Sequence, residues 1–432
     1  MDEFELTINK IVPGGFGLGF HMEKAVFVPF SAPGDQLLVT VDKKHKNHSF
    51  ATIKKIITPG LDRVPPDCAV YGECGGCQLR HLKKPLQGEI KTAFVEESLQ
   101  RIGKIKPDGV VSPIVASPWG GGYRRRTGLK VKVVKSGVLL GFFAAATHRV
   151  VDIASCPILD HRINDLLNPL RELILSLEGK NYLPEVDCVA GDENIGLLFH
   201  TLRAFSKFDV DKLKAFANEY KIPQLWIQQG KKSRLRSLHS NRVLHYGVEN
   251  FSINFKPGDF IQINGEANGL LVARVMEALG PKVGDGNSVA WDLFCGIGNF
   301  TLPLATKFAK VYGVESNPRA LDRLKGNVKI AALNNIVPIK ADLLKPAGLD
   351  RLKELESADL VLLDPPRSGG LELIKRLAKY RPQRVVYVSC DPATFARDAG
   401  VLVSAGYILK SLLPIDLFPQ TSHVEMVGVF EI

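Results

Sequence analysis

The spacing of apolar and polar positions divides the 432-residue chain into regions of different periodicity. Over the first 60 residues, short apolar runs alternate with glycine-containing turns such as Pro13-Gly14-Gly15 and Pro33-Gly34-Asp35. Short alternating strands with turns at this spacing are typical of a small β-barrel. We therefore predict an N-terminal β-barrel over residues 1–60.

A helix is predicted next, over residues 82–102, where Leu86, Ile90, Phe94 and Leu99 recur near helical spacing. Residues 112–249 mix β-like runs with basic groups at 123–126 and 231–236. This stretch predicts a central α+β region.

From residue 251 onward, β-like runs alternate with helical stretches. The runs are 290–294, 311–315, 337–341, 360–364, 385–389, 408–413 and 424–430. This alternation predicts βαβ units and a largely parallel, doubly wound sheet of the Rossmann type, an α/β fold. Ligands of such sheets bind outside the carboxyl ends of the strands, so residues there are the candidates for chemistry.

Charge and cysteine content indicate the kind of partner, the cellular compartment and the use of the thiols. The net charge of +11, from 56 Lys and Arg against 45 Asp and Glu, suggests a polyanionic partner. No run approaches the roughly 18 apolar residues of a membrane span, and the acidic start has no apolar signal region, so we expect a cytoplasmic protein. An odd number of cysteines, seven, then favours metal ligation or catalysis over disulfides.

The end of the first run carries a glycine-rich turn, Phe294-Cys-Gly296-Ile-Gly298-Asn299. The dinucleotide fingerprint G-x-G-x-x-G fails, because Thr301 stands at the third glycine position. Glu315 ends the second run, where an acid can accept hydrogen bonds from ribose hydroxyls. Together these features fit S-adenosylmethionine better than NAD, and an ordinary tight turn is the alternative.

Two aspartates follow later runs. Asp364 stands before two prolines that fix the backbone, and Asp342 lies one residue past the third run, beside the expected position of an adenine amino group. The alternative for Asp364 is a rigid loop with a capping carboxylate.

Cys390 directly follows the fifth run, and Asp391 and Pro392 then form a helix start. A thiol at a helix N-terminus is expected to have a lowered pKa, whereas strand cysteines are usually buried and inert. Glu425 begins the mostly apolar final run, where a carboxylate is costly unless it is used or paired with an arginine.

These motifs, with Phe260-Ile-Gln262-Ile-Asn264, Asp364-Pro-Pro-Arg367, Ser389-Cys390-Asp-Pro and His423-Val-Glu425, resemble the RNA uracil-C5 methyltransferase family over essentially the whole chain. Domain order and length most resemble the branch that modifies 23S ribosomal RNA. The first 60 residues resemble the family's TRAM domain, an RNA-binding barrel.

The resemblance implies that Cys390 is the nucleophile and Glu425 the general base. It also implies the positions that bind S-adenosylmethionine, which are Gln262, Phe294, Asn299, Glu315, Asp342 and Asp364. The reaction needs a cysteine nucleophile, because uracil C5 becomes nucleophilic only after a thiolate adds at C6. A base must then remove the C5 proton, and the target base must leave its stack.

Four further cysteines match the family's cluster-binding positions, which are Cys68, Cys74, Cys77 and Cys156. Four thiolates can hold zinc or a 4Fe-4S cluster, and spacing alone does not decide between them. The family points to 4Fe-4S with a structural or RNA-positioning role. The segment 141–148 lacks the basic residues expected there, which leaves open how this region contacts RNA.

We expect a monomer of three domains: a barrel at 1–60, a cluster-binding domain at 61–81 and 112–250, and a methyltransferase domain at 82–111 and 251–432. The expected activity is methylation of a uridine in 23S ribosomal RNA. Transfer RNA is the alternative substrate. A cytosine methyltransferase and a non-catalytic RNA-binding assembly factor explain fewer of the motifs, since the first places its thiol after proline and the second needs neither Cys390 nor Glu425.

Overall fold

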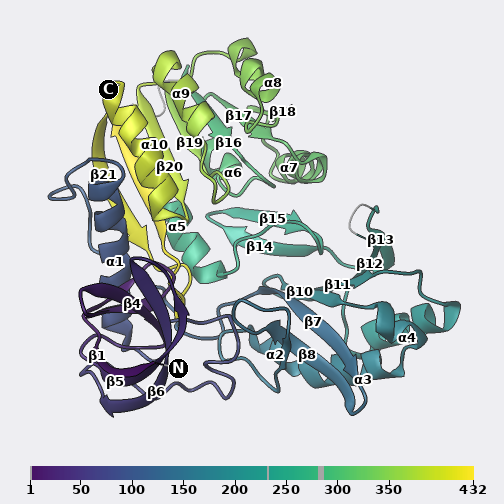
Figure 1. Cartoon of the computed structure of the whole chain (residues 1–432). Helices are drawn as coiled ribbons and strands as arrows, with labels where there is room; N and C mark the ends of the chain where they lie inside the picture. The colour runs from purple at the N-terminus through teal and green to yellow at the C-terminus, as the bar shows by residue number, and fades with distance from the viewer. Residues whose placement is uncertain (1, 231–232, 281–286) are drawn as a thin grey trace.

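The computed structural model describes residues 2–230, 233–280 and 287–432, so that Lys231 and Lys232 of the second basic group lie outside the described residues. These parts form a six-stranded sheet, two seven-stranded sheets and a separate hairpin (Figure 1). None of the helices in this part of the chain combines the length and apolarity that a bilayer span requires.

The N-terminal sheet has the strand order β1-β5-β6-β4-β3-β2. Its strands are β1 (Glu3–Thr7), β2 (Lys10–Val12), β3 (Phe16–His21), β4 (Lys24–Pro29), β5 (Gln36–Lys44) and β6 (His48–Thr58). Alternating residues such as Val26, Val28, Leu37 and Val39 are buried together in one core, and Figure 1 shows the strands wrapped around it. Burial along these strands therefore alternates with a period of two.

The central region has the sheet order β13-β12-β11-β10-β7-β8-β9. Its elements are β7 (Arg126–Val134), β8 (Gly137–Phe143), β9 (Val150–Asp152), α2 (His161–Asp165), α3 (Leu167–Ser176), a 3-10 helix (Glu178–Tyr182), β10 (Glu185–Ala190), β11 (Ile195–Thr201), α4 (Lys207–Glu219), β12 (Gln224–Gln229) and β13 (Arg236–Ser240). Leu170 and Ile174 of α3 and Leu213 of α4 share its core.

A hairpin of β14 (Leu244–Val248) and β15 (Phe251–Phe255) joins this region to the last one. Both strands contribute to the same apolar core as the C-terminal helices, through residues such as Tyr246 and Phe255. The expected domain boundary at residue 250 falls inside this hairpin. The hairpin therefore packs with the C-terminal helices.

The C-terminal sheet has the order β18-β17-β16-β19-β20-β22-β21. Its strands are β16 (Val289–Leu293), β17 (Lys310–Glu315), β18 (Ile336–Lys340), β19 (Leu360–Leu363), β20 (Arg384–Ser389), β21 (Ile408–Ile415) and β22 (Glu425–Glu431). The first five strands are parallel, whereas β22 is antiparallel to both of its neighbours. The α/β doubly wound prediction is confirmed by the fold.

Helices cover both faces of this sheet. They are α5 (Gly265–Glu277), α6 (Thr301–Leu304), α7 (Pro318–Ile330), α8 (Pro346–Asp350), a 3-10 helix (Arg351–Glu354), α9 (Leu371–Tyr380) and α10 (Pro392–Ser404). The helices α5, α6 and α7 share one core, and α8, α9 and α10 share the other. Two covered faces explain why the central strands of the sheet are buried and largely apolar.

The helix α1 (Lys84–Arg101) belongs to this second core although it lies early in the chain. Val95 and Leu99 are buried with Phe395 and Leu402 of α10. Phe94, on the same helix, packs instead in a small cluster with Ile11 of β2. The helix therefore contacts both the N-terminal sheet and the C-terminal one, beside β21 (Figure 1).

Candidate active site

Three of the candidate residues lie at the carboxyl ends of neighbouring strands, at one edge of the C-terminal sheet. Leu293 of β16 pairs with Val314 of β17 and with Leu363 of β19, so Phe294, Glu315 and Asp364 come next in adjacent strands. The strand order reverses between β16 and β19, which is where open α/β sheets form a ligand crevice. The register of the three parallel strands is therefore enough to bring these residues together at the crevice.

The glycine-rich turn lies over this edge with an unusual backbone. Phe294 has a φ of 65°, Gly296 of 55° and Gly298 of 105°. A Cβ added at Gly296 would meet no atom within 4 Å, so the backbone there borders open space. The Glu315 carboxylate accepts hydrogen bonds from the amides of Gly296, at 3.1 Å, and Asn317, at 2.6 Å. It therefore fixes the turn and keeps acceptor capacity for a ligand.

The other three cofactor-site candidates lie on separate segments of the chain, each with polar contacts of its own. Asp342 follows β18, beyond Glu315, and accepts hydrogen bonds from Leu344 N and Lys345 Nζ. The Asn299 amide exchanges two hydrogen bonds with Asn268 of α5. The carbonyl of Gln262 accepts a 3.0 Å hydrogen bond from Arg125 of the central region.

Cys390 and Glu425 meet at the same edge. Ser389 at the end of β20 pairs with Met426 of β22, so Cys390 and Glu425 are the next positions on two antiparallel neighbours. Because β22 runs against the other strands, its first residue lies level with their last residues. Glu425 is buried, with 3% of its surface exposed, and Cys390 is partly exposed.

The electrostatics of this group differ from the prediction for Cys390. Burial, with the nearby carboxyls of Glu425 and Asp364, raises the pKa of the Cys390 thiol to about 11, and Arg367 offsets part of this. The predicted lowering of the thiol pKa is wrong for this structure. A helix start does follow, with Asp391 capping the amide of Thr394 at 2.8 Å, but two facing carboxyls and burial outweigh it.

The two carboxyls are also perturbed. Burial raises the pKa of Asp364 to about 7. Burial and the charge of Asp364 raise the pKa of Glu425 well above its usual range, while Arg367 lowers it. Titratable groups whose environments shift their pKa values in this way cluster at functional sites.

Sequence reasoning did not assign roles to two residues at this centre. Arg367 lies against Cys390 and Glu425 and places Nη2 3.4 Å from His423 Nε2. Asp292 of β16 is buried under the glycine turn, where it accepts a 2.5 Å hydrogen bond from Thr301 and burial raises its pKa to about 7. An aspartate inside an apolar strand was the available signal for Asp292.

The four candidate ligand cysteines come together from distant positions. Cys68, Cys74, Cys77 and Cys156 line one cavity, together with Arg80 and others. In the described parts of the chain, no group of three or more His, Cys, Asp or Glu side chains is arranged to hold a metal ion. The four cysteine side chains thus share the lining of one space.

Alkylation of Cys390 should reveal its raised pKa. The thiolate is the form that reacts, so we expect the iodoacetamide rate at Cys390 to rise about tenfold per pH unit toward a midpoint near 11. Peptide-resolved mass spectrometry measures this rate. In Arg367→Gln the rate at a given pH should fall, because a cation that favours the thiolate is lost. A midpoint at or below about 8.5, the value of a free thiol, would contradict the arrangement.

Known proteins share this geometry and sequence. Residues 113–431 match the model of a family described as tRNA (Uracil-5-)-methyltransferase. The chain belongs to this family. Among curated members, it is 36% identical to the 23S rRNA (uracil(1939)-C(5))-methyltransferase RlmD of Alkalilimnicola ehrlichii over 100% of this chain and 97% of that protein. The enzyme of the same name from Aromatoleum aromaticum is 37% identical over 98% and 99%.

A solved structure of the same family also spans the whole chain. The crystal structure of the Pyrococcus abyssi tRNA (uracil-54, C5)-methyltransferase in complex with S-adenosyl-L-homocysteine superimposes with a TM-score of 0.75 at 25% identity. It covers 99% of this chain, and this chain covers 100% of it. The α/β methyltransferase fold predicted from sequence is therefore that of this family.

Proposed function

We propose that this protein transfers a methyl group from S-adenosylmethionine to C5 of a uridine in 23S ribosomal RNA. Full-length relatives at 35–37% identity carry that activity in their names, and the net charge of +11 suits a polyanionic substrate. The observation that carries the proposal is that Cys390 and Glu425 are the next positions after the Ser389–Met426 strand pair, at the edge of the sheet that bears the glycine turn and the Glu315 carboxylate.

Cys390 is the nucleophile in this proposal. Its sulfur forms a bond to C6 of the uracil ring, and the electrons of the C5–C6 double bond move to C5 and O4. C5 then attacks the methyl carbon of the sulfonium donor, and the C–S bond of the donor breaks to leave S-adenosylhomocysteine. A cationic donor beside Cys390 would also favour the thiolate, which the facing carboxyls oppose.

Glu425 is the base that completes the reaction. It removes the proton from C5, the C5–C6 double bond forms again, and the Cys390 sulfur leaves C6 with its electron pair. A raised pKa of Glu425, from burial and Asp364, makes it a strong base once it is ionised. Arg367 favours the ionised form of both groups.

The methyl donor fits the crevice at the strand edge. We assign its binding to Gln262, Phe294, Asn299, Glu315, Asp342 and Asp364. The open space over Gly296 admits the donor close to the backbone, and Glu315 can accept from its ribose. Asp342, which follows the next strand β18, would bind the adenine end.

A 4Fe-4S cluster on Cys68, Cys74, Cys77 and Cys156 is part of the proposal. The four cysteines line one cavity, and the resemblance to the family favours a cluster over zinc, which would need all four sulfurs about 2.3 Å from one point. Arg80 lines the same cavity, and its buried Nη1 has no hydrogen-bond partner within the described residues. Such a donor suits the sulfurs of an anionic cluster. When bound, the cluster would cross-link the cysteine-bearing segments.

Elemental analysis tests the cluster. Protein purified without oxygen is expected to hold about four iron atoms per chain, and Cys77→Ser should lose them. Cys188→Ser, at a buried thiol of the central core, serves as the control for iron content. One zinc atom per chain, with no iron, would reject the cluster and retain the site.

The domain division remains part of the proposal. The barrel at 1–60 would be a TRAM domain that binds RNA, followed by a cluster domain at 61–81 and 112 to the start of β14, with α1 and the rest forming the methyltransferase domain. A cleft between the first two is lined by Phe16, Phe30, Arg124, Phe143 and His148. Aromatic faces can stack unpaired bases, so RNA contact there does not require basic residues in segment 141–148.

The choice of RNA has a direct test. Labelled methyl transfer to unmodified 23S ribosomal RNA is expected to exceed transfer to unmodified tRNA at least about tenfold in kcat/KM, equal to about 1.4 kcal/mol of discrimination. The tRNA alternative has support in the family description and in the archaeal structure. A preference for tRNA would replace the proposed substrate, and transfer to neither RNA would favour a non-catalytic role.

A further inference from the structure

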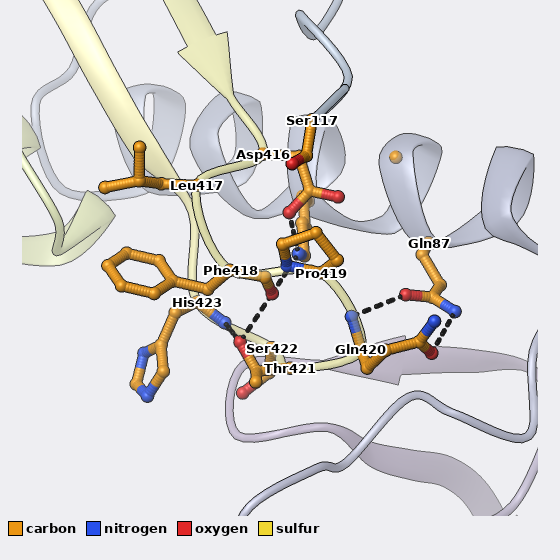
Figure 2. A network of polar contacts seen from close by, with 12 residues as sticks. Gln87, Ser117, Asp416, Leu417, Phe418, Pro419, Gln420, Thr421, Ser422 and His423 are labelled. Atoms are coloured by element: carbon orange, nitrogen blue, oxygen red, sulfur yellow. Dashed lines mark hydrogen bonds and ion pairs between the residues drawn. The ribbon is translucent and has the colours of Figure 1, made fainter. Parts of the chain in front are cut away.

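The loop that precedes the proposed base is held by residues far from it in the chain. Residues 416–424, here the 416–424 loop, connect β21 to β22 and end immediately before Glu425. Figure 2 shows this loop against α1 and the N-terminal segments. Any role for the loop in catalysis rests on the proposed function of Glu425.

Gln420, in the middle of the loop, has a strained backbone that its neighbours maintain. Its φ is 72°, in the left-handed region, although it is not glycine, and only 8% of its surface is exposed. Gln87 of α1 accepts from Gln420 N and donates to Gln420 Oε1, both at 3.0 Å. The Gln420 carbonyl accepts from the amides of Gln78 and Leu79, at 3.1 and 2.9 Å. A conformation of this kind persists only where its surroundings determine it.

A second set of contacts anchors the start of the loop. Lys91, buried one turn further along α1, places Nζ 2.6 Å from Asp416 Oδ1 and donates to the carbonyl of Phe418 at 3.0 Å. Tyr123 from the central region donates to the carbonyl of Pro419 at 2.8 Å. Residues of the N-terminal part, of α1 and of the central region therefore all hold this one short loop.

We propose that Gln87 and Gln420 are positioning residues that set the place of Glu425 relative to Cys390. Nothing in the reaction requires a glutamine pair at this position, and neither side chain belongs to the candidate donor site. Glu425 is five positions after Gln420, and its carboxylate must reach the C5 proton of a base bonded to Cys390. A small displacement of the Glu425 carboxylate would lower the rate of proton removal by a disproportionately large factor.

The variant Gln87→Met tests this role, because it keeps the length of the side chain and removes both hydrogen-bonding atoms. We expect kcat to fall about 10- to 100-fold, while KM for RNA and the dissociation constant of S-adenosylmethionine stay within about twofold. The covalent adduct of protein and RNA should accumulate, because its resolution needs Glu425. Single-turnover kinetics and denaturing gels measure the rate and the adduct.

Matched variants separate positioning from general damage. Gln100→Met changes an exposed glutamine on the same helix and should behave as wild type. Gln420→Met removes the other side of the pair, and the double variant should be no slower than the slower single variant. If Gln87→Met fails to fold, Gln420→Met alone tests the positioning role. This second variant is expected to fold, because the hydrogen bonds from the amides of Gln78 and Leu79 to the carbonyl of residue 420 remain.

Two results overturn the inference in distinguishable ways. If wild type and Gln100→Met methylate RNA through an adduct, and Gln87→Met and Gln420→Met do so equally fast without accumulating it, the pair has no positioning role. A loss of RNA affinity with kcat unchanged also excludes that role. If the wild type transfers no methyl group, the proposed function itself fails, and this inference fails with it.

Discussion

Replacement of Cys390 by alanine is expected to reduce methyl transfer by about 10⁴-fold or more and to abolish the protein–RNA adduct. Without a sulfur at C6, C5 of uracil is not activated, and no other group of the site can supply the bond. The backbone of β20 and the helix start at Asp391 do not depend on the thiol. Labelled methyl transfer and adduct formation measure the effect, and S-adenosylmethionine binding should persist.

Cys188→Ala is the matched control for this variant. Its thiol is buried in the core of the central region, away from the strand edge, so methyl transfer should remain near wild type. Methyl transfer by Cys390→Ala at the wild-type rate would refute the covalent mechanism and leave the family membership intact.

Glu425→Gln is expected to trap the reaction after methyl transfer. The amide keeps the shape of the side chain but cannot accept the C5 proton, so turnover should fall about 10²- to 10⁴-fold while the adduct accumulates. Because burial and Asp364 raise the pKa of Glu425, its basic form increases as pH rises. Adduct resolution by wild type should therefore accelerate with pH, and the variant should lose this dependence.

Glu431→Gln provides the control at the far end of the same strand. Glu431 is partly exposed and pairs with Arg384, on the opposite edge of the sheet from the crevice. Its replacement should leave adduct resolution unchanged. Unimpaired methylation by Glu425→Gln, with no adduct, would remove the assigned role.

The sequence predicted the C-terminal fold well, because buried parallel strands and amphipathic helices have different periods. The strand ends then placed Phe294, Glu315 and Asp364 correctly at one edge, since parallel register follows from the βαβ connections. The antiparallel direction of β22 has no such local signal. It is nevertheless what brings the start of that strand level with Cys390.

Electrostatics and long-range contacts were harder to predict. A helix start beside Cys390 suggested a lowered thiol pKa, but burial and the Glu425 carboxyl, 35 positions later in sequence and close in space, produce the opposite shift. The contact between Gln87 and Gln420 could not be predicted either, because a glutamine on a helix is ordinary until its partner is known. Sequence patterns reflect residues that are close in the chain. The raised pKa of Cys390 and the contact of Gln87 with Gln420 arise from residues that are distant in the chain and close in the fold.

The early position of α1 has a consequence for how the chain is made. Lys91 and its partner Asp416 are 325 positions apart, and a ribosome adds about 5–20 residues per second, so α1 emerges roughly 16–65 s before that partner is synthesised. During this interval Val95, Leu99 and Lys91 lack the C-terminal surface that later covers them. We expect the nascent chain to bind chaperones while this surface is exposed. A fragment that begins at β14 would also lack α1, which contributes Val95 and Leu99 to the C-terminal core.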